Sequence, residues 1–169
     1  VQNTRLGWSS CSNFVSDENY QIKGYTATYF AAHMINLEWL QHRAGVHEMF
    51  PSSTDITDAD SNLLVTSYAV HRPDGNWSLM LVNRDETNPN TVRVVFEDAK
   101  RKRTASFSRP VTLVSFGSEQ YVWINDGPNS HPDPDHPPVA TQLRGPPSTF
   151  TLPQASITVL RGRVGLRKD

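Results

Sequence analysis

The hydrophobic pattern of the chain changes its period near residue 45. Between Tyr20 and about Arg43 apolar residues recur at helical spacing and no proline occurs. Gly45 suits the C′ position of a helix, and His42 and Arg43 lie where the helix dipole favours positive charge. We therefore predict a helix over residues 20–44, followed by strands.

The predicted helix is apolar on two sides. At about 100° per residue, one stripe holds Phe30, Met34 and Leu37, and a second, roughly opposite stripe holds Ala32, Ile35 and Trp39 together with Thr28. A helix of this kind is buried on both sides. These six apolar residues are the interface candidates, because a stripe left bare by this chain would indicate a missing partner.

Beyond residue 45 the period becomes two. The segments Leu64–His71 and Trp77–Asn83 flank a Pro-Asp-Gly turn, which predicts a β-hairpin. Five further strands are predicted, at Thr91–Glu97, Val111–Gly117, Tyr121–Ile124, Val139–Leu143 and Ala155–Arg161. Short strands separated by turn signals predict a mainly β fold, an antiparallel β-sandwich of about seven to nine strands with one N-terminal α-helix.

This pattern divides the chain into four parts. A polar segment covers residues 1–19, the helix residues 20–44, the β-sandwich residues 45–162 and a basic tail residues 163–169. Within the sandwich, the proline-rich stretch 127–138 is predicted to be a long loop rather than a strand.

Composition narrows the function classes. The 169 residues suit one domain and are too few for a complete (β/α)₈ barrel, which needs about 250. A net charge of −1 gives no general attraction to nucleic acid, and no apolar run approaches the ~20 residues of a membrane span. One cysteine, Cys11, excludes an internal disulfide framework. We therefore expect neither nucleic acid nor membrane as a partner.

Two groups of side chains suggest ligand chemistry. Trp77, Tyr121 and Trp123 are candidates for stacking on sugar rings, although strand aromatics more often fill a core. The weak metal candidates are His131, Asp133, Asp135 and His136. Their alternating prolines favour an extended surface loop in which the side chains do not converge, so we predict no metal and no cofactor.

Catalytic chemistry is not evident from the residues. Hydrolysis needs a nucleophile with a base, or two carboxylates about 5–10 Å apart. Asp17 and Glu18 are neighbours in a polar loop and are expected to point apart. Glu38 and His42 have the i,i+4 spacing of an ordinary surface pair on a helix. We predict no catalytic residue in this chain.

Three segments resemble one family. Leu64–Asp85 resembles the C-terminal β-sandwich of barrel-type glycoside hydrolases, of the family 39-like group. Leu152–Arg161 is similar to the closing strand of that sandwich, which also occurs in families 30 and 51. Gly24–Gln41, with Glu38-Trp39, is similar to the last helix of the barrel. Together the segments cover roughly residues 20–162.

The resemblance implies that the helix packs between the sandwich and a barrel. It also implies that the catalytic glutamates lie upstream of this helix. In the faintly similar segment Thr4–Ser9, Arg5 stands where the nucleophile glutamate is expected. The leading hypothesis is a non-catalytic accessory sandwich of a glycoside hydrolase-like protein, whose partner is the barrel or another copy of the chain.

Two alternatives remain open. The chain is a carbohydrate-binding or self-assembling module in one of them, with polysaccharide as a partner. In the other, a complete enzyme forms its site between chains, with Glu18 or Glu38 contributing. An extracellular or periplasmic location is favoured over the cytoplasm.

Overall fold

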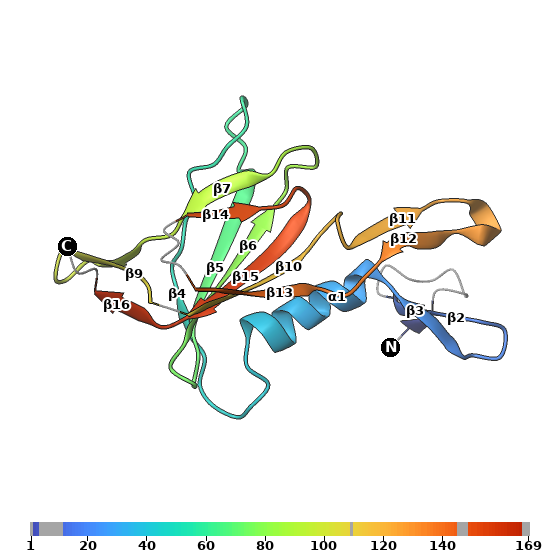
Figure 1. The fold of residues 1–169 in the computed structure, drawn as a ribbon, viewed down its shortest axis with the longest axis horizontal. Coiled ribbons are helices and arrows are strands. Elements are labelled where there is room, and N and C mark those ends of the chain that lie inside the picture. The colour runs from blue at the N-terminus through green and yellow to red at the C-terminus, as the bar shows by residue number, and fades with distance from the viewer. Residues whose placement is uncertain (1, 4–11, 109, 145–148, 167–169) are drawn as a thin grey trace.

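The centre of the protein is a six-stranded antiparallel sheet with the strand order β13-β10-β15-β6-β5-β4 (Figure 1). The computed structural model describes residues 2–3, 12–108, 110–144 and 149–166, so that the predictions about Arg5 and Cys11 lie outside the described residues. The six strands are β4 (Glu48–Phe50), β5 (Val65–His71), β6 (Trp77–Asn83), β10 (Val111–Phe116), β13 (Val139–Leu143) and β15 (Ser156–Gly162).

One face of this sheet is covered by short strands. They form two small sheets, β14-β7 and β16-β9-β8. Their bounds are β7 (Asn90–Arg93), β8 (Phe96–Asp98), β9 (Arg103–Phe107), β14 (Thr149–Leu152) and β16 (Val164–Leu166). Val65, Leu160, Phe107 and Phe150 meet in the core between the layers. The predicted mainly β, sandwich-like fold is confirmed.

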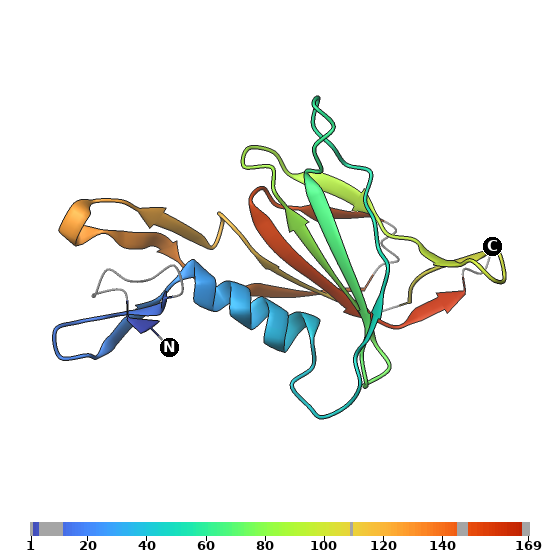
Figure 2. The same cartoon turned by 180° about the vertical axis from the view of Figure 1, so that it is seen from behind.

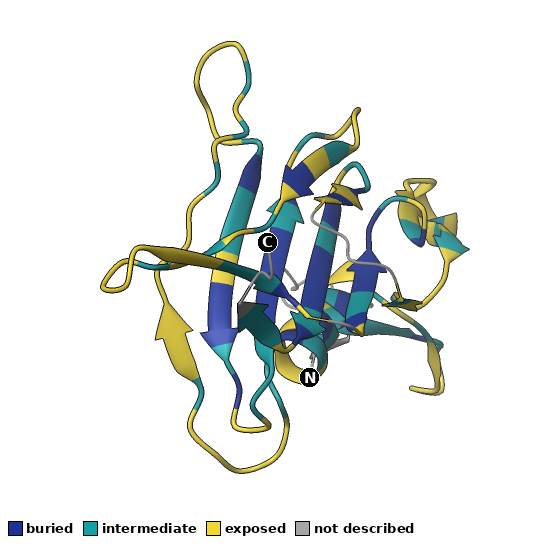
Figure 3. Cartoon of the chain, turned by 60° about the vertical axis from the view of Figure 1, so that its left-hand side comes forward, coloured by how far each residue is buried: buried dark blue, intermediate teal, exposed yellow. Residues whose placement is uncertain are grey.

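The other face is covered by one helical segment, α1 (Ala27–His33) followed by the π-helix η2 (Met34–Trp39), as Figure 2 shows from behind. Phe30, Met34 and Trp39 pack there on the central sheet in a second core. Figure 3 shows buried residues concentrated in the long central strands and exposed residues over the outlying hairpins.

The predicted helix bounds of 20–44 are wrong at both ends. Ile22–Tyr25 forms β3, which pairs with β2 (Ser12–Ser16), and the helix starts only after the extended residue Thr26. At the other end Leu40 is extended, with φ −85° and ψ 172°. His42 and Arg43 therefore lie beyond the helix rather than in its last turn.

The π-helical turn also rearranges the two apolar stripes. In a π-helix the hydrogen bonds join residues five apart, as in the bond from the Leu40 N–H to the Ile35 carbonyl. Met34 and Trp39 are five apart and both are buried, and the Trp39 indole N–H donates to the Tyr68 carbonyl at 3.1 Å. Leu37 turns outward, so Trp39 replaces it beside Phe30 and Met34.

Two hairpins extend from the same end of the molecule (Figures 1 and 2). One is β2–β3, which β1 (Gln2–Asn3) joins through β2. The other is β11 (Tyr121–Ile124) with β12 (His131–Asp135), whose loop contains the 3₁₀ turn η3 (Gly127–Asn129).

Two segment predictions need correction. The prediction of a loop over 127–138 is wrong for β12, because an extended proline-containing segment pairs with β11. The predicted tail is wrong for Val164–Leu166, which pairs with β9. Among the described residues no helix is long and apolar enough to cross a membrane.

Candidate functional site

The three candidate sugar-stacking aromatics lie in different surroundings. Tyr121 is half-buried at the end of the helix-covered core, with ring centroids 6.1 Å from both Phe30 and Phe116. Burial raises the pKa of its hydroxyl, and the charge of Asp135 adds to this. Tyr121 therefore contributes to the core, where its ring packs against Phe30 and Phe116.

Trp77 belongs to a row of aromatic rings beside the strand-covered core. Its ring centroid is 4.6 Å from that of Phe50 and 5.3 Å from that of Phe96, and Phe96 in turn contacts Phe107 at 5.0 Å. Trp123, by contrast, is 45% exposed on β11. Of the three candidates, Trp123 alone offers an open ring, and the structure does not bring them together.

The four weak metal candidates lie on and just after β12. An extended strand spaces its side chains along its length, so His131, Asp133 and Asp135 do not converge. His131 Nδ1 lies 2.8 Å from the Asn129 carbonyl, within its own turn. Within the described ranges no three His, Cys, Asp or Glu side chains are grouped to hold a metal ion.

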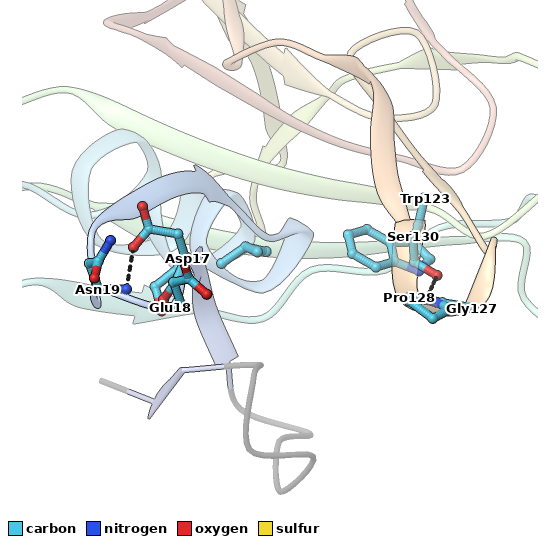
Figure 4. A pocket seen from close by; sticks show the side chains of 9 residues that line it. Asp17, Glu18, Asn19, Trp123, Gly127, Pro128 and Ser130 are labelled. Carbon is cyan, nitrogen blue, oxygen red and sulfur yellow. Dashed lines mark hydrogen bonds between the residues drawn. The ribbon is translucent and has the colours of Figure 1, made fainter.

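A cleft of about 770 Å³ lies between the two hairpins. Figure 4 shows Asp17, Glu18 and Asn19 of the β2–β3 turn on one wall, and Trp123, Pro128 and Ser130 of the β11–β12 hairpin on the other. Val15, Ser16 and Gly127 complete the lining. Sequence reasoning identified Trp123 but not this cleft, because its two walls are more than 100 residues apart in the chain.

Asp17 builds the turn of the first wall. Its Oδ1 accepts the backbone N–H groups of Asn19 and Gln21, both at 2.9 Å, and its Oδ2 lies 3.0 Å from Lys23 Nζ. The Gln21 N–H and Lys23 lower the pKa of Asp17. Glu18 is exposed, and its carboxylate has no hydrogen-bond or ionic partner in the described part of the chain. The cleft thus presents one free carboxylate rather than an acid–base pair.

Glu38 joins the helix to the sheet through contacts with His33, Arg72 and Arg161, which together are called the clamp. Its Oε2 is 2.8 Å from Arg161 Nη1, and its Oε1 is 3.4 Å from His33 Nε2. Its backbone carbonyl also accepts hydrogen bonds from Arg72 at 3.1 Å and Arg161 at 3.3 Å. The predicted surface pair with His42 is therefore wrong, because Glu38 turns towards the sheet. Arg161 comes from β15 and Arg72 from the residue after β5, so both lie far from Glu38 in the sequence and no local motif predicts the contact.

The outward side of the helical segment carries no charge. Its exposed residues are Ala27, Thr28, Ile35, Asn36 and Leu37, and Glu38 is the one acidic or basic residue other than His33 between residues 26 and 40. Ile35 is 37% exposed and Leu37 46% exposed. Of the six interface candidates, Phe30, Met34 and Trp39 are buried within the chain, Ala32 is half-buried, and Ile35 and Leu37 face outward.

No family profile and no curated protein matches this sequence. Its structure is similar to part of CelM2, a bifunctional glucanase-xylanase from a metagenome library, with a TM-score of 0.39, 14% identity, and 60% of this chain and 16% of that chain covered. It is also similar to part of the GH51 arabinofuranosidase from Xanthomonas axonopodis pv. citri, with a TM-score of 0.39, 20% identity, and 69% of this chain and 21% of that chain covered. A third similar structure is the GH51 α-L-arabinofuranosidase from Thermotoga petrophila RKU-1, with a TM-score of 0.39, 14% identity, and 60% of this chain and 19% of that chain covered.

This chain thus spans about a fifth or less of the length of these structures. Membership of family 39 stays a prediction.

Proposed function

We propose that this chain is the non-catalytic β-sandwich portion of a glycoside hydrolase-like protein, and that the outer side of α1 and η2 packs against the barrel domain of that protein. The observation that carries the proposal is the uncharged, partly apolar outer side of a helix whose inner side is already buried. The resemblance of Gly24–Gln41 to the last helix of a barrel supplies the identity of the partner.

A helix that faces water on one side ordinarily carries charged and strongly polar residues there. Here Ile35 and Leu37 are exposed beside the uncharged Asn36, while the neighbouring Glu38 turns towards Arg161 on the sheet. Full burial of an exposed side chain of this kind contributes about 1.5–3 kcal/mol. Ile35 and Leu37 are 37% and 46% exposed, so covering both contributes a fraction of that amount each and favours association. A barrel of about 250 residues offers a surface large enough to cover the whole helix.

The non-catalytic part of the proposal is supported by the state of the carboxylates. Asp17 is committed to its turn and Glu38 to its clamp. Glu18 has no second carboxylate free beside it in the cleft. A glycosidase needs two carboxyl groups that share one scissile bond.

The first experiment is peptide mass mapping of the native polypeptide and of the chains that copurify with it. Barrel sequence upstream of Val1, or in a copurifying chain, is the expected result. Native material without a barrel overturns the docking proposal. Turnover of aryl glycosides by the purified chain, lost in Glu18→Gln, overturns the non-catalytic one.

A second experiment tests the helix surface in the polypeptide that the mapping identifies. The double variant Ile35→Lys/Leu37→Lys is expected to separate barrel from sandwich, seen as a second transition in calorimetry. Val95→Lys is the control, since Val95 is 44% exposed and lies between β7 and β8 of the strand cover. A single unchanged transition in both variants contradicts docking on this surface, and a dimer of the isolated chain in sedimentation assigns the surface to a second copy instead.

A further inference from the structure

The cleft between the hairpins has two preorganised walls. On the first, the Asp17 carboxylate fixes the backbone of the turn that carries Glu18 and Asn19. On the second, Ser130 Oγ accepts the Asp126 N–H at 2.9 Å and donates to the Gly127 carbonyl at 2.8 Å, which fixes the tip that carries Pro128. Each wall is held by its own short-range hydrogen bonds, which lowers the cost of ordering when a ligand enters.

The groups left over for a ligand are few and well defined. The Glu18 carboxylate, the Asn19 side-chain amide and the Trp123 indole N–H have no hydrogen-bond partner within the described ranges. The Trp123 ring is 45% exposed and lines the cleft. The cleft therefore offers an aromatic surface on one wall and planar polar groups on the other (Figure 4).

We propose that this cleft binds a short neutral oligosaccharide. A pyranose ring has an apolar C–H face, which fits Trp123, and a rim of hydroxyls, which fits Glu18 and Asn19. The volume of about 770 Å³ lies in the usual range of small-ligand sites, roughly 300–1,000 Å³.

The charge of the cleft selects against anionic ligands. Asp17 and Glu18 contribute two negative charges to one wall and Lys23 a single positive charge beside them. Uronic acids and phosphorylated sugars are therefore repelled. The saccharide is bound and not cleaved, since the cleft has one free carboxylate. This binding is independent of the helix surface, and its failure leaves the docking proposal standing.

The test uses the whole chain and a panel of neutral tetrasaccharides built from glucose, xylose, mannose or arabinose. Binding is followed by the NMR signal of the Trp123 indole N–H. At least one sugar is expected to bind and shift that signal. Trp123→Ala is expected to weaken binding about tenfold, because the variant loses the apolar surface that covers the C–H face of the sugar, and Glu18→Gln several-fold.

Val122→Ala is the matched control, because Val122 is 38% exposed on the same strand and does not line the cleft. Far-UV circular dichroism confirms that each variant stays folded. No binding by any member of the panel at millimolar concentration overturns the proposal, as does binding that Trp123→Ala leaves unchanged. Tetramethylammonium is included as a cationic probe. If it binds where the sugars do not, and Glu18→Gln abolishes that binding, the cleft is a cation site and the saccharide proposal is overturned.

Discussion

The two faces of the six-stranded sheet are covered by different kinds of secondary structure. Five short strands close the core on one face, and one helical segment closes the core on the other. β15 shows both situations side by side, because Val159 faces the helix and Leu160 faces the strands, and each is fully buried. Both cores are therefore sealed within this chain.

The difference lies in the outer surface of each cover. The covering strands mix exposed charged and polar residues with buried ones, as in Glu97, Arg103 and Arg93. The helix presents no charge to the outside. The helix-side core is well buried, but the outer side of the helix lacks the charged residues typical of a solvent-facing surface. We therefore expect a partner on the helix-covered side.

The largest expected effect separates the two cores. Leu160→Ala is expected to lower the free energy of unfolding by about 2–5 kcal/mol for the whole sheet, because Leu160 is fully buried on β15, which pairs with both β6 and β10. Met34→Ala creates a cavity of the same class, also about 2–5 kcal/mol, beneath a helix held by far fewer strands.

Hydrogen exchange distinguishes the two variants. In Met34→Ala the amides of α1 and η2 are expected to exchange before those of β5, β6 and β15, as a separate opening of the helix. In Leu160→Ala all of these amides are expected to exchange together. Identical patterns in both variants contradict the distinction between the two covers.

A smaller effect is expected at the clamp that joins the helix to the sheet. Glu38→Gln removes the charge that faces Arg161 at 2.8 Å, and both side chains are about a fifth exposed. The expected loss is about 1–2 kcal/mol in chemical denaturation, less than for a fully buried pair because solvent screens part of the interaction.

Glu97→Gln is the matched control, since Glu97 is exposed on β8 of the strand cover and its carboxylate has no hydrogen bond or ion pair in the described part of the chain. Equal stability losses in Glu38→Gln and Glu97→Gln contradict the clamp. Repeating the Glu38 measurement with Arg161→Met in a double-mutant cycle isolates the pair itself.

The smallest expected effect is on how stability depends on pH, through Asp85 on the strand-covered side. The backbone N–H groups of Thr87 and Asn88 lower the pKa of Asp85 to about 2 from its ordinary value of 3.8. A carboxyl whose pKa is lower in the folded state stabilises the fold above its unfolded pKa, and this contribution is lost as the pH falls towards 2.

Asp85→Asn is therefore expected to flatten the dependence of the unfolding free energy on pH between about 4 and 2. Glu86→Gln, at the exposed neighbouring position, serves as the control. An unchanged slope in Asp85→Asn contradicts this role. Asp85→Asn is expected to leave the stability contribution of the Glu38 clamp unchanged, since Asp85 lies in the β6–β7 loop and does not contact the clamp.

Local signals explain which elements the sequence predicted well. The hairpin of β5 and β6 has an alternating pattern and a Pro-Asp-Gly turn, and the predicted bounds agree with the structure to within a residue. The bounds of β11 and β13 agree as well. By contrast, β3 lies within an apolar stretch without proline, and only its pairing with β2 makes it a strand.

The candidate site was predictable only in part. An exposed aromatic at Trp123 was among the predicted sugar contacts, but the cleft, and with it the role of Glu18, depends on two distant hairpins meeting at one end. Glu38 was recognised as a carboxylate of interest, and its clamp needs arginines from β15 and from the residue after β5.

The sequence by itself determined the β-rich class, the presence of one helix within residues 20–44 and the apolar character of that helix on more than one side. Periodicity and turn chemistry are local, and they act before distant segments meet. The tertiary structure alone decided which apolar residues became core. One π-helical turn brought Trp39 inward and turned Leu37 outward. The choice followed from packing on the sheet, because burial of an aromatic ring together with its hydrogen bond to the Tyr68 carbonyl outweighs ideal helical geometry.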